Sequence, residues 1–517
     1  MNRPTPVTQP RRMHSSGYST RITPAPAAAA AVVANATDDG NDDFKLKLHG
    51  QFMLYRLYLV RSICPTVHLN RWYRLNLALI NECNLFRHQD MEPDGAVRLQ
   101  CEFLVRNPAA DADELYAIEA RPMQDEVWAF DGAVEMEWPG FKGRGKGGLE
   151  YRVVRRKGWE GGAAVPPLAV AEEKYIHVFP DPQVEHSVNV LPLVVGPLTI
   201  IDELDHELDH ALDPDAVSLI GHGSRSPSPA AVVPTLPTNE IPTQFWDAED
   251  SLYVMYRAFP VPDLREKTSA KNGCAVIPML LINELSDGGI PGKVWDSAYV
   301  LSGFFSNMIS RNLKWMEGKH IVDLSAGTGF VGLFLASIAS TLPHPTFATA
   351  TMTPTTPHIT ITDLPHALAH IHKNLRLNAH LIARPARSAR LKIRSLAWGC
   401  DADVRALRPC DVVIASDVIY ETTLFADLVK TLVALSIPGR TRVYIGYKRR
   451  GLEREDEAAF FRMCREHFDI TVIGGEAMLA QAVGLAGADV DDDEGAMLPD
   501  LAKKSGVFVC RMMRRVR

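Results

Sequence analysis

Residues that could hold a small charged molecule recur at the ends of predicted strands. Residues 320–324 form a short apolar strand containing Asp323; Gly327 and Gly329 follow in a turn, before an apolar helix expected to reach Ala339. Glycine lets the backbone approach a ligand where a Cβ would clash, and the start of a helix offers unpaired N–H groups. The segment therefore predicts a site for a nucleotide cofactor.

Two classes of cofactor use this geometry. Together with Gly332, the two glycines match G-x-G-x-x-G, the pattern of dinucleotide-binding sites. Asp323 separates the two classes, because an ionised carboxylate at the end of a buried strand needs a cationic or donor partner. The ammonium group of S-adenosylmethionine is such a partner, whereas the pyrophosphate of NAD would be repelled. The pattern favours S-adenosylmethionine, with an ordinary glycine turn and an NAD-dependent oxidoreductase as alternatives.

The chain after residue 320 alternates predicted strands and helices. Further strands are expected at 358–362, 391–396, 411–416, 441–447, 469–473 and 506–511, and helices at 365–379 and 424–435. This order predicts an α/β fold with a doubly wound, mostly parallel, seven-stranded Rossmann-like sheet, whose ligands bind at the carboxyl ends of the strands. Asp323, Asp363, Trp398 and Asp417 lie at or just after such ends.

The region before this sheet is less well defined. Residues 1–43 are predicted to be a disordered tail and residues 224–243, rich in Ser, Pro and Thr, a flexible linker. Residues 44–223 form an N-terminal α+β region whose chemistry the sequence does not reveal, and residues 244–517 form the C-terminal domain. The basic, glycine-rich residues 140–148 are expected to be a solvated loop. The acidic residues 491–494 are expected to lie in a mobile loop between the last two strands.

One metal-site pattern is present and rejected. His206 to His210 match H-E-x-x-H, which can place two imidazoles on one zinc ion. The repeated Leu-Asp-His around them is also typical of an acidic helix face. Pro214 would end the helix too early for it to present a third zinc ligand nearby. We expect no metal.

Composition narrows the class of protein. The formal net charge of -7 and the pI near 6.2 argue against nucleic acid as a partner. The apolar run at 190–201 contains prolines and is shorter than the roughly 20 residues that span a bilayer, so no membrane segment is expected. Eight scattered cysteines without a C-x-x-C pair suit a reducing compartment. We expect a cytoplasmic monomer, with the nucleus as an alternative; prolines in the first 26 residues argue against a mitochondrial signal.

Five segments in order give a resemblance to a known family. They are Val294-Trp295-Asp296-Ser297-Ala298, Asp323-Leu-Ser-Ala-Gly-Thr-Gly-Phe-Val-Gly332, Thr362-Asp363-Leu364-Pro365, Ala397-Trp398-Gly399 and Ser416-Asp417-Val418-Ile419-Tyr420. With them, residues 274–517 resemble the class I, seven-β-strand methyltransferases. Within that class the chain resembles the family-16 lysine methyltransferases, which modify non-histone proteins.

The resemblance implies a role for each residue. The cofactor-binding set would be Trp295, Asp323, Ser325, Ala326, Gly327, Gly329, Asp363, Trp398 and Ser416. In that set the backbone of Ser325 to Gly327 would meet the methionine part and Asp363 the ribose hydroxyls, while Trp398 and Ser416 would flank adenine and sulfonium. Asp417 and Tyr420 match the family's Asp-x-x-Tyr motif and would be catalytic, orienting the acceptor amine. Ser325 stands where the family usually has glycine, and Ala397 where it often has aspartate.

The resemblance also implies an activity. The protein would be an enzyme that transfers a methyl group from S-adenosylmethionine to a lysine of a non-histone protein, such as a translation factor or a chaperone. A histidine or a small-molecule amine as acceptor, and a non-catalytic scaffold that binds the cofactor, are the alternatives. The N-terminal region would then dock the protein substrate.

Overall fold

The computed structural model describes residues 54–87, 90–91, 95–104, 116–123, 137–143, 145–156, 174–186, 188–201, 255–262, 264, 278–285, 289–342, 356–382, 389–407, 409–450, 452–474 and 489–516. The tail at 1–43, the linker at 224–243 and the His206 to His210 motif lie outside these ranges. No described helix is both long and apolar enough to cross a lipid bilayer.

A first sheet contains the described N-terminal strands. These are β1 (Leu54–Leu59), β2 (Thr66–His68), β3 (Tyr73–Ile80), β4 (Ala96–Leu104), β5 (Tyr116–Arg121), β6 (Gly140–Lys142), β7 (Lys146–Arg155), β8 (Lys174–Pro180), β9 (Asn189–Leu191), β10 (Leu193–Ile201), β11 (Met255–Pro260) and β12 (Met279–Glu284). Their order is β12-β11-β10-β8-β4-β6-β7-β3-β1-β9, with β2 beside β10 and β5 beside β7. Buried and half-buried residues alternate strictly along β3, so one of its faces packs into the core of this sheet.

Two features of this sheet differ from the sequence-based expectations. Residues 140–148 are not a solvated loop: β6 and β7 form a hairpin in which Gly140 pairs with Gly148. The predicted boundary at residue 244 places β11 and β12 in the C-terminal domain, but both strands continue the first sheet: β11 pairs antiparallel with β10, and β12 pairs antiparallel with β11. The residue types of a buried strand do not show which sheet the strand joins.

The free edge of β12 is closed by amide side chains. Asn378 accepts a hydrogen bond from Leu281 N (2.9 Å) and donates one to Leu281 O (2.6 Å), and Asn374 accepts one from Asn283 N (2.9 Å). Both asparagines are fully buried. They satisfy backbone groups that would otherwise face a missing strand.

The second sheet carries the predicted ligand edge. Its strands are β13 (His320–Leu324), β14 (His358–Asp363), β15 (Arg390–Ser395), β16 (Val412–Ser416), β17 (Arg442–Tyr447), β18 (Phe468–Ile473), β19 (Asp489–Asp491) and β20 (Phe508–Arg514). Their order is β15-β14-β13-β16-β17-β20-β18-β19, and pairing is parallel except on both sides of β20. The seven predicted strands and the doubly wound order are confirmed, and β19 is an additional edge strand.

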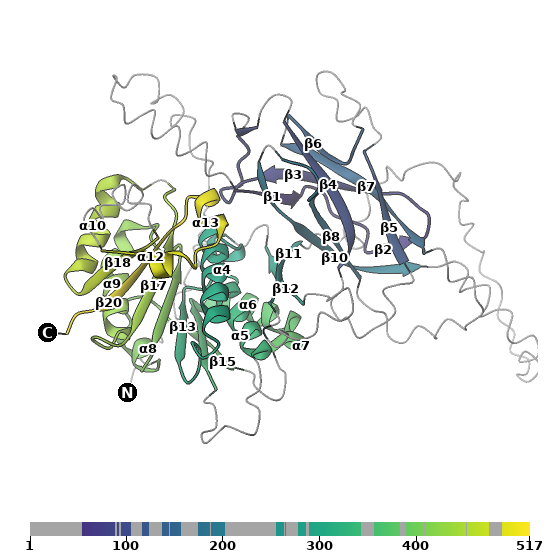
Figure 1. Ribbon diagram of the computed structural model, residues 1–517. Helices are drawn as coiled ribbons and strands as arrows, with labels where there is room; N and C mark the ends of the chain where they lie inside the picture. Colours follow the sequence, from purple (N-terminus) through teal and green to yellow (C-terminus); the bar gives the residue numbers. More distant parts are fainter. Residues whose placement is uncertain are drawn as a thin grey trace, which may run out of the picture. The chain divides into compact units, whose positions relative to one another are not determined.

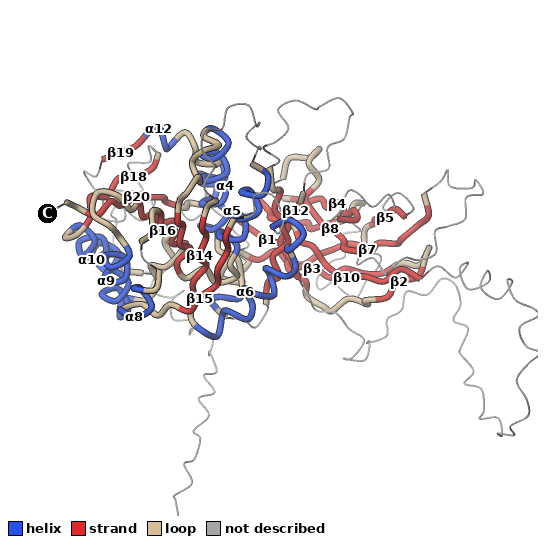
Figure 2. The backbone as a smooth tube through the Cα atoms, turned by 90° about the horizontal axis from the view of Figure 1, so that it is seen from below, coloured by secondary structure: helices blue, strands red, loops and turns tan. Residues whose placement is uncertain are grey.

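Helices cover both faces of the second sheet. They are α4 (Asp296–Arg311), α5 (Phe330–Thr341), α6 (Pro365–Leu377), α7 (Ala379–Ile382), α8 (Asp401–Arg405), α9 (Phe425–Leu435), α10 (Arg454–Arg465), α12 (Asp492–Gly495) and α13 (Asp500–Ser505), with 3₁₀ turns η5 (Ile290–Gly292) and η6 (Thr422–Leu424). Ile321 packs with α4 and α5, whereas Val322 packs with α9 and α10. Successive strand residues therefore pack into two separate cores. Figures 1 and 2 show the helices on the two faces of the sheet.

The acidic segment before the last strand is ordered where it is described. Residues 489–505 include β19, α12 and α13, so the expectation of a mobile loop is wrong for them. Arg511 Nη1 lies 2.7 Å from Glu494 and 3.2 Å from Asp491. A basic residue of β20, which β18 separates from β19 in the sheet, thus pairs with the acids of this segment.

Candidate active site

The turn between β13 and α5 uses the left-handed backbone that glycine favours. Gly327 has a φ of 57° and Gly329, which precedes α5, a φ of 79°. Ser325 adopts the same region with a φ of 57°, which is uncommon for a residue with a Cβ. Ala326 N donates to Thr362 O (2.9 Å) and ties the turn to the end of β14. The turn is therefore held against the neighbouring strand at the ligand edge of the sheet.

Asp323 is a buried carboxylate with one free oxygen. Oδ2 accepts a hydrogen bond from Gly332 N (2.8 Å), while Oδ1 has no partner among the described residues. Burial raises the pKa of Asp323 to about 7; the bond from Gly332 opposes that shift and the nearby Asp363 adds to it. A donor or a cation placed at Oδ1 would stabilise the ionised form, as the sequence predicts.

Asp363 fixes the glycine turn from the next strand. Its Oδ2 accepts from Gly327 N and its Oδ1 from Leu364 N, both at 2.7 Å. Burial raises the pKa of Asp363, although these two N–H groups act against the shift. The carboxylate thus lies between the ends of β13 and β14, next to Asp323.

Aromatic residues lie beside the same turn. Trp398 Nε1 donates to Ser325 Oγ (2.9 Å), and the Trp398 ring centre lies 6.2 Å from that of Tyr420. Tyr420 is 47% exposed, and burial of the rest of its side chain, together with Asp363 and Glu421, raises the pKa of its hydroxyl. The Tyr420 hydroxyl therefore stays protonated at neutral pH.

Ser416 is the last residue of β16, the strand on the other side of β13, and Asp417 follows it. Ser416 Oγ is buried without a partner among the described residues. Asp417 has a φ of 55°, the left-handed conformation, and its side chain is 3% exposed. The chain order reverses between β13 and β16, which is the position where doubly wound sheets bind ligands.

The Asp417 carboxylate is fully engaged. Arg450 Nη1 donates to Oδ1 (2.6 Å) and Nη2 to Oδ2 (2.7 Å). Lys448 N donates to Oδ1 (3.2 Å) and Ser297 N to Oδ2 (3.3 Å). An ionised carboxylate offers about four acceptor positions, and all are used here. Asp417 can meet a further donor only by giving up one of these bonds.

Trp295 lies beside Arg450, the residue that binds Asp417. Its Nε1 donates to Ile290 O (3.0 Å), and the guanidinium carbon of Arg450 lies 4.8 Å from its ring centre. Lys293 Nζ lies 4.5 Å from the same ring. Trp295 therefore links the start of α4 to the cation that holds Asp417.

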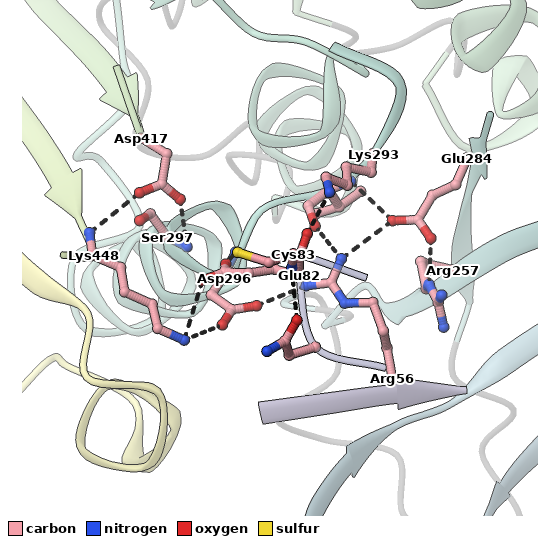
Figure 3. A network of polar contacts seen from close by, with 12 residues as sticks. Arg56, Glu82, Cys83, Arg257, Glu284, Lys293, Asp296, Ser297, Asp417 and Lys448 are labelled. Carbon is pink, nitrogen blue, oxygen red and sulfur yellow. Dashed lines mark hydrogen bonds and ion pairs between the residues drawn. The ribbon is translucent and has the colours of Figure 1, made fainter. Parts of the chain in front are cut away.

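One charged residue that follows a strand of the first sheet contacts Arg450, the partner of Asp417. Glu82, just after β3, accepts from Arg450 Nε (2.9 Å) and Nη2 (2.8 Å). Lys448 Nζ donates to Asp296 (2.7 Å) and lies 3.3 Å from Glu82. Figure 3 shows Glu82, Asp296 and Lys448 in one network with Asp417. The candidate site thus includes a residue that is far from it in the sequence.

Comparison with known proteins agrees with this geometry. Residues 277–467 match a family model described as lysine methyltransferase. EEF1A lysine methyltransferase 3 from Xenopus tropicalis is 30% identical over 31% of this chain and 59% of its own length, and that from Mus musculus is 31% identical over 35% and 66%. Protein N-lysine methyltransferase METTL21A from Danio rerio is 29% identical over 35% and 70%. Residues 277–467 resemble the lysine methyltransferase family.

The methyltransferase-like part is one portion of a longer chain. This chain spans less than two thirds of each of the two EEF1A lysine methyltransferase 3 relatives, and the match covers about a third of its own residues. Residues 277–467 contain every residue that the sequence analysis selected as cofactor-binding or catalytic. Asp323, Ser325, Asp363, Trp398 and Tyr420 surround the glycine turn. Trp295 and Asp417 form a second group, because both contact Arg450.

Sequence reasoning missed the charged partners of Asp417 in the methyltransferase-like part. Lys448 and Arg450 belong to a basic Lys-Arg-Arg run directly after β17, at the ligand edge of the sheet. Three consecutive basic residues directly after a strand are a pattern that could have indicated Lys448 and Arg450 as site residues. Glu82 offers no comparable signal, because it stands alone in a turn of the N-terminal region.

Gly332 in α5 is expected to tolerate no side chain. A Cβ there would lie 2.5 Å from Ile361 Cγ1 and 3.1 Å from Asp323 Oδ2. We expect Gly332→Ala to lower the free energy of unfolding by about 1 to 3 kcal/mol, the usual effect of overpacking, measured by urea unfolding. Gly303→Ala in α4 is the control, because the three heavy atoms nearest to its Cβ would all belong to the Pro499 ring, the closest at 3.0 Å. Equal losses in the two variants would contradict the steric argument.

Proposed function

We propose that this chain is an S-adenosylmethionine-dependent protein-lysine methyltransferase that acts on a non-histone protein. The observation that carries the proposal is the row of strand-end residues from β14 to β16, within the part that matches the lysine methyltransferase family. Two buried polar atoms in this row, Asp323 Oδ1 and Ser416 Oγ, lack partners among the described residues. Buried polar atoms are normally hydrogen-bonded, so both fit a polar ligand.

The residues divide into a cofactor group and an acceptor group. Those that would hold the cofactor are Trp295, Asp323, Ser325, Ala326, Gly327, Gly329, Asp363, Trp398 and Ser416. Bound there, S-adenosylmethionine would supply an electrophilic methyl group to an unprotonated amine. Asp363 already orders the glycine turn, and its position at the end of β14 suits ribose hydroxyls.

The acceptor amine would lie on the side of Asp417 and Tyr420. Transfer of a methyl group to an amine depends mainly on positioning, since the amine is itself the nucleophile. The protonated Tyr420 hydroxyl can donate a hydrogen bond to an amine nitrogen or accept one from it. Asp417, saturated by Arg450 and two backbone N–H groups, orients an amine by exchanging one of these donors for it.

The relatives suggest the first acceptor to try. Two are named for EEF1A, a translation factor, and this supports a protein of that class as substrate. We further propose that the protein acts in the cytoplasm as a monomer; no disulfide links the cysteines that the structure describes. Fractionation of cells and light scattering of the purified protein test these two points.

The test is transfer of a labelled methyl group from S-adenosylmethionine to EEF1A, comparing the wild type with Asp363→Ala. The variant is expected to bind the cofactor about 10 to 100 times more weakly, the loss of one or two hydrogen bonds to a charged group. Asp469→Ala is the control, because this aspartate is 71% exposed on β18. A label on a lysine that Asp363→Ala loses supports the proposal. A label on histidine or on a small amine would replace the lysine assignment, and absence of cofactor binding would overturn it.

A further inference from the structure

Eight charged side chains form a continuous chain of alternating sign. In order they are Asp417, Arg450, Glu82, Lys448, Asp296, Arg56, Glu284 and Arg257, and neighbouring nitrogen and oxygen atoms are 2.6, 2.8, 3.3, 2.7, 2.7, 3.7 and 2.7 Å apart. We call these residues the ion chain. It starts at the end of β16 and ends in β11 of the first sheet, and Figure 3 shows the part from Lys448 to Arg257.

The ion chain is buried and balanced. Its most exposed member, Arg450, has 21% of its side chain accessible, and Asp296 has none. Burial alone would raise the pKa of Glu82, but Arg450 and Lys448 hold it well below its usual range. Burial would likewise raise the pKa of Glu284, but Arg257 and Arg56 lower it. These two carboxylates are therefore ionised at neutral pH and neutralise the buried cations beside them.

Arg450 links Asp417, in the candidate active site, to the rest of the ion chain, and all of its N–H donors are used. Nε and one Nη2 proton bind Glu82, while Nη1 and the other Nη2 proton bind Asp417. Nη1 also donates to Lys448 O (3.0 Å). A guanidinium has five N–H donors in a fixed plane, and all five are used. Its plane, and hence the direction in which it meets Asp417, is set by both carboxylates.

Glu82 reaches Arg450 from a different sheet. It lies two residues after the end of β3, and Asp296 N at the start of α4 donates to its Oε2 (3.3 Å). The other anchors of the ion chain in the first sheet are Arg56 in β1, Glu284 in β12 and Arg257 in β11. The first sheet therefore contributes one carboxylate to a guanidinium whose other carboxylate is the proposed catalytic Asp417.

We propose that Glu82 is a positioning residue of the active site, which acts through Arg450 to set the orientation of Asp417. Glu82 gives Arg450 a second carboxylate, so Arg450 can release one bond to Asp417 for an incoming amine without leaving a buried cation unpaired. The N-terminal region is then part of the catalytic apparatus rather than only a docking module. The catalytic consequence rests on the proposed methyl transfer.

The test replaces Glu82 by glutamine in the full-length chain. This removes the charge and keeps the shape. Amide hydrogen exchange, followed by mass spectrometry without any substrate, is expected to become faster at Ser297 and Lys448, whose N–H groups bind Asp417. Glu102→Gln is the matched control, because Glu102 lies in β4 of the same sheet with 61% of its side chain exposed.

Kinetics supply the second measurement. In Glu82→Gln we expect kcat for methyl transfer to fall on the order of 10²-fold, as a small misplacement of a catalytic group does, and KM for S-adenosylmethionine to change less than about twofold, because uniform binding is untouched. Glu82→Asp, which keeps the charge, should recover part of the lost kcat. A merely structural role would instead change thermal stability in both variants and leave kcat per folded molecule constant.

The two proposals fail in different ways. If the wild type transfers no methyl group, the proposed function fails, while the exchange rates at Ser297 and Lys448 still decide whether Glu82 controls Asp417. Equal exchange in Glu82→Gln and Glu102→Gln overturns the positioning role. An unchanged kcat in Glu82→Gln overturns it as well, even where methyl transfer itself is observed.

Discussion

Replacing Arg450 by methionine is expected to lower the free energy of unfolding by about 3 to 5 kcal/mol, the usual effect of removing one partner of a buried ion pair. The substitution removes five hydrogen bonds and leaves Glu82 and Asp417, 4% and 3% exposed, without their shared cation. Lys448 still neutralises part of the charge on Glu82, but Asp417 keeps only two backbone donors. Equilibrium urea unfolding at neutral pH measures the difference.

Arg440→Met provides the comparison for this result. Arg440 pairs with Asp411 at 2.7 Å, but its side chain is 61% exposed. Its loss should lower the free energy of unfolding by less than about 1 kcal/mol, as is typical of surface pairs. If both methionine variants unfold at the same urea concentration, burial of the ion chain adds nothing to stability. Glu82→Gln in the Arg450→Met background should recover part of the loss, because it removes one of the unpaired charges.

Asp323→Asn is expected to stabilise the ligand-free protein above pH 7 and to leave its stability unchanged near pH 4. The pKa of Asp323 in the folded protein is about 7, above its ordinary value of 3.8, because the carboxylate is buried. Between these values the folded state holds a proton that the unfolded state has lost. Stability therefore falls as pH rises through this window, by up to about 4 kcal/mol for one group. Asparagine resembles the protonated acid and removes that slope.

Urea unfolding of both proteins at pH 5 and pH 8 tests the sign. The gap between Asp323→Asn and the wild type should be wide at pH 8 and narrow at pH 5, because the penalty accumulates with pH. Asp469→Asn, at a side chain that is 71% exposed, is the control for replacing an aspartate by asparagine. The variant should also bind S-adenosylmethionine more weakly, since the ionised Oδ1 is the proposed partner of its ammonium group. A gap of the same size at both pH values would show that Asp323 does not titrate in this range.

The sequence was enough to predict those features that depend on residues close together in the chain. The alternation of strand segments with helices placed β13 to β18 and β20, and polar residues at strand ends marked Asp323, Asp363 and Asp417, because parallel strands bring their carboxyl ends to one edge. The pair of Glu82 and Arg450, separated by 368 residues, has no period and no motif. Nor did the sequence reveal that β11 and β12 extend the first sheet, since the residue types of a buried strand do not show which sheet it joins.

The asparagines at the edge of β12 have a consequence for how the chain avoids self-association. β12 is the last strand of its sheet, and an exposed strand edge invites pairing with another molecule. Asn374 and Asn378, at the end of α6, occupy that edge with hydrogen bonds that imitate a neighbouring strand. Helix α6 therefore also covers the edge of the N-terminal sheet against pairing with another molecule, and a fragment ending at β12 would lose this cover.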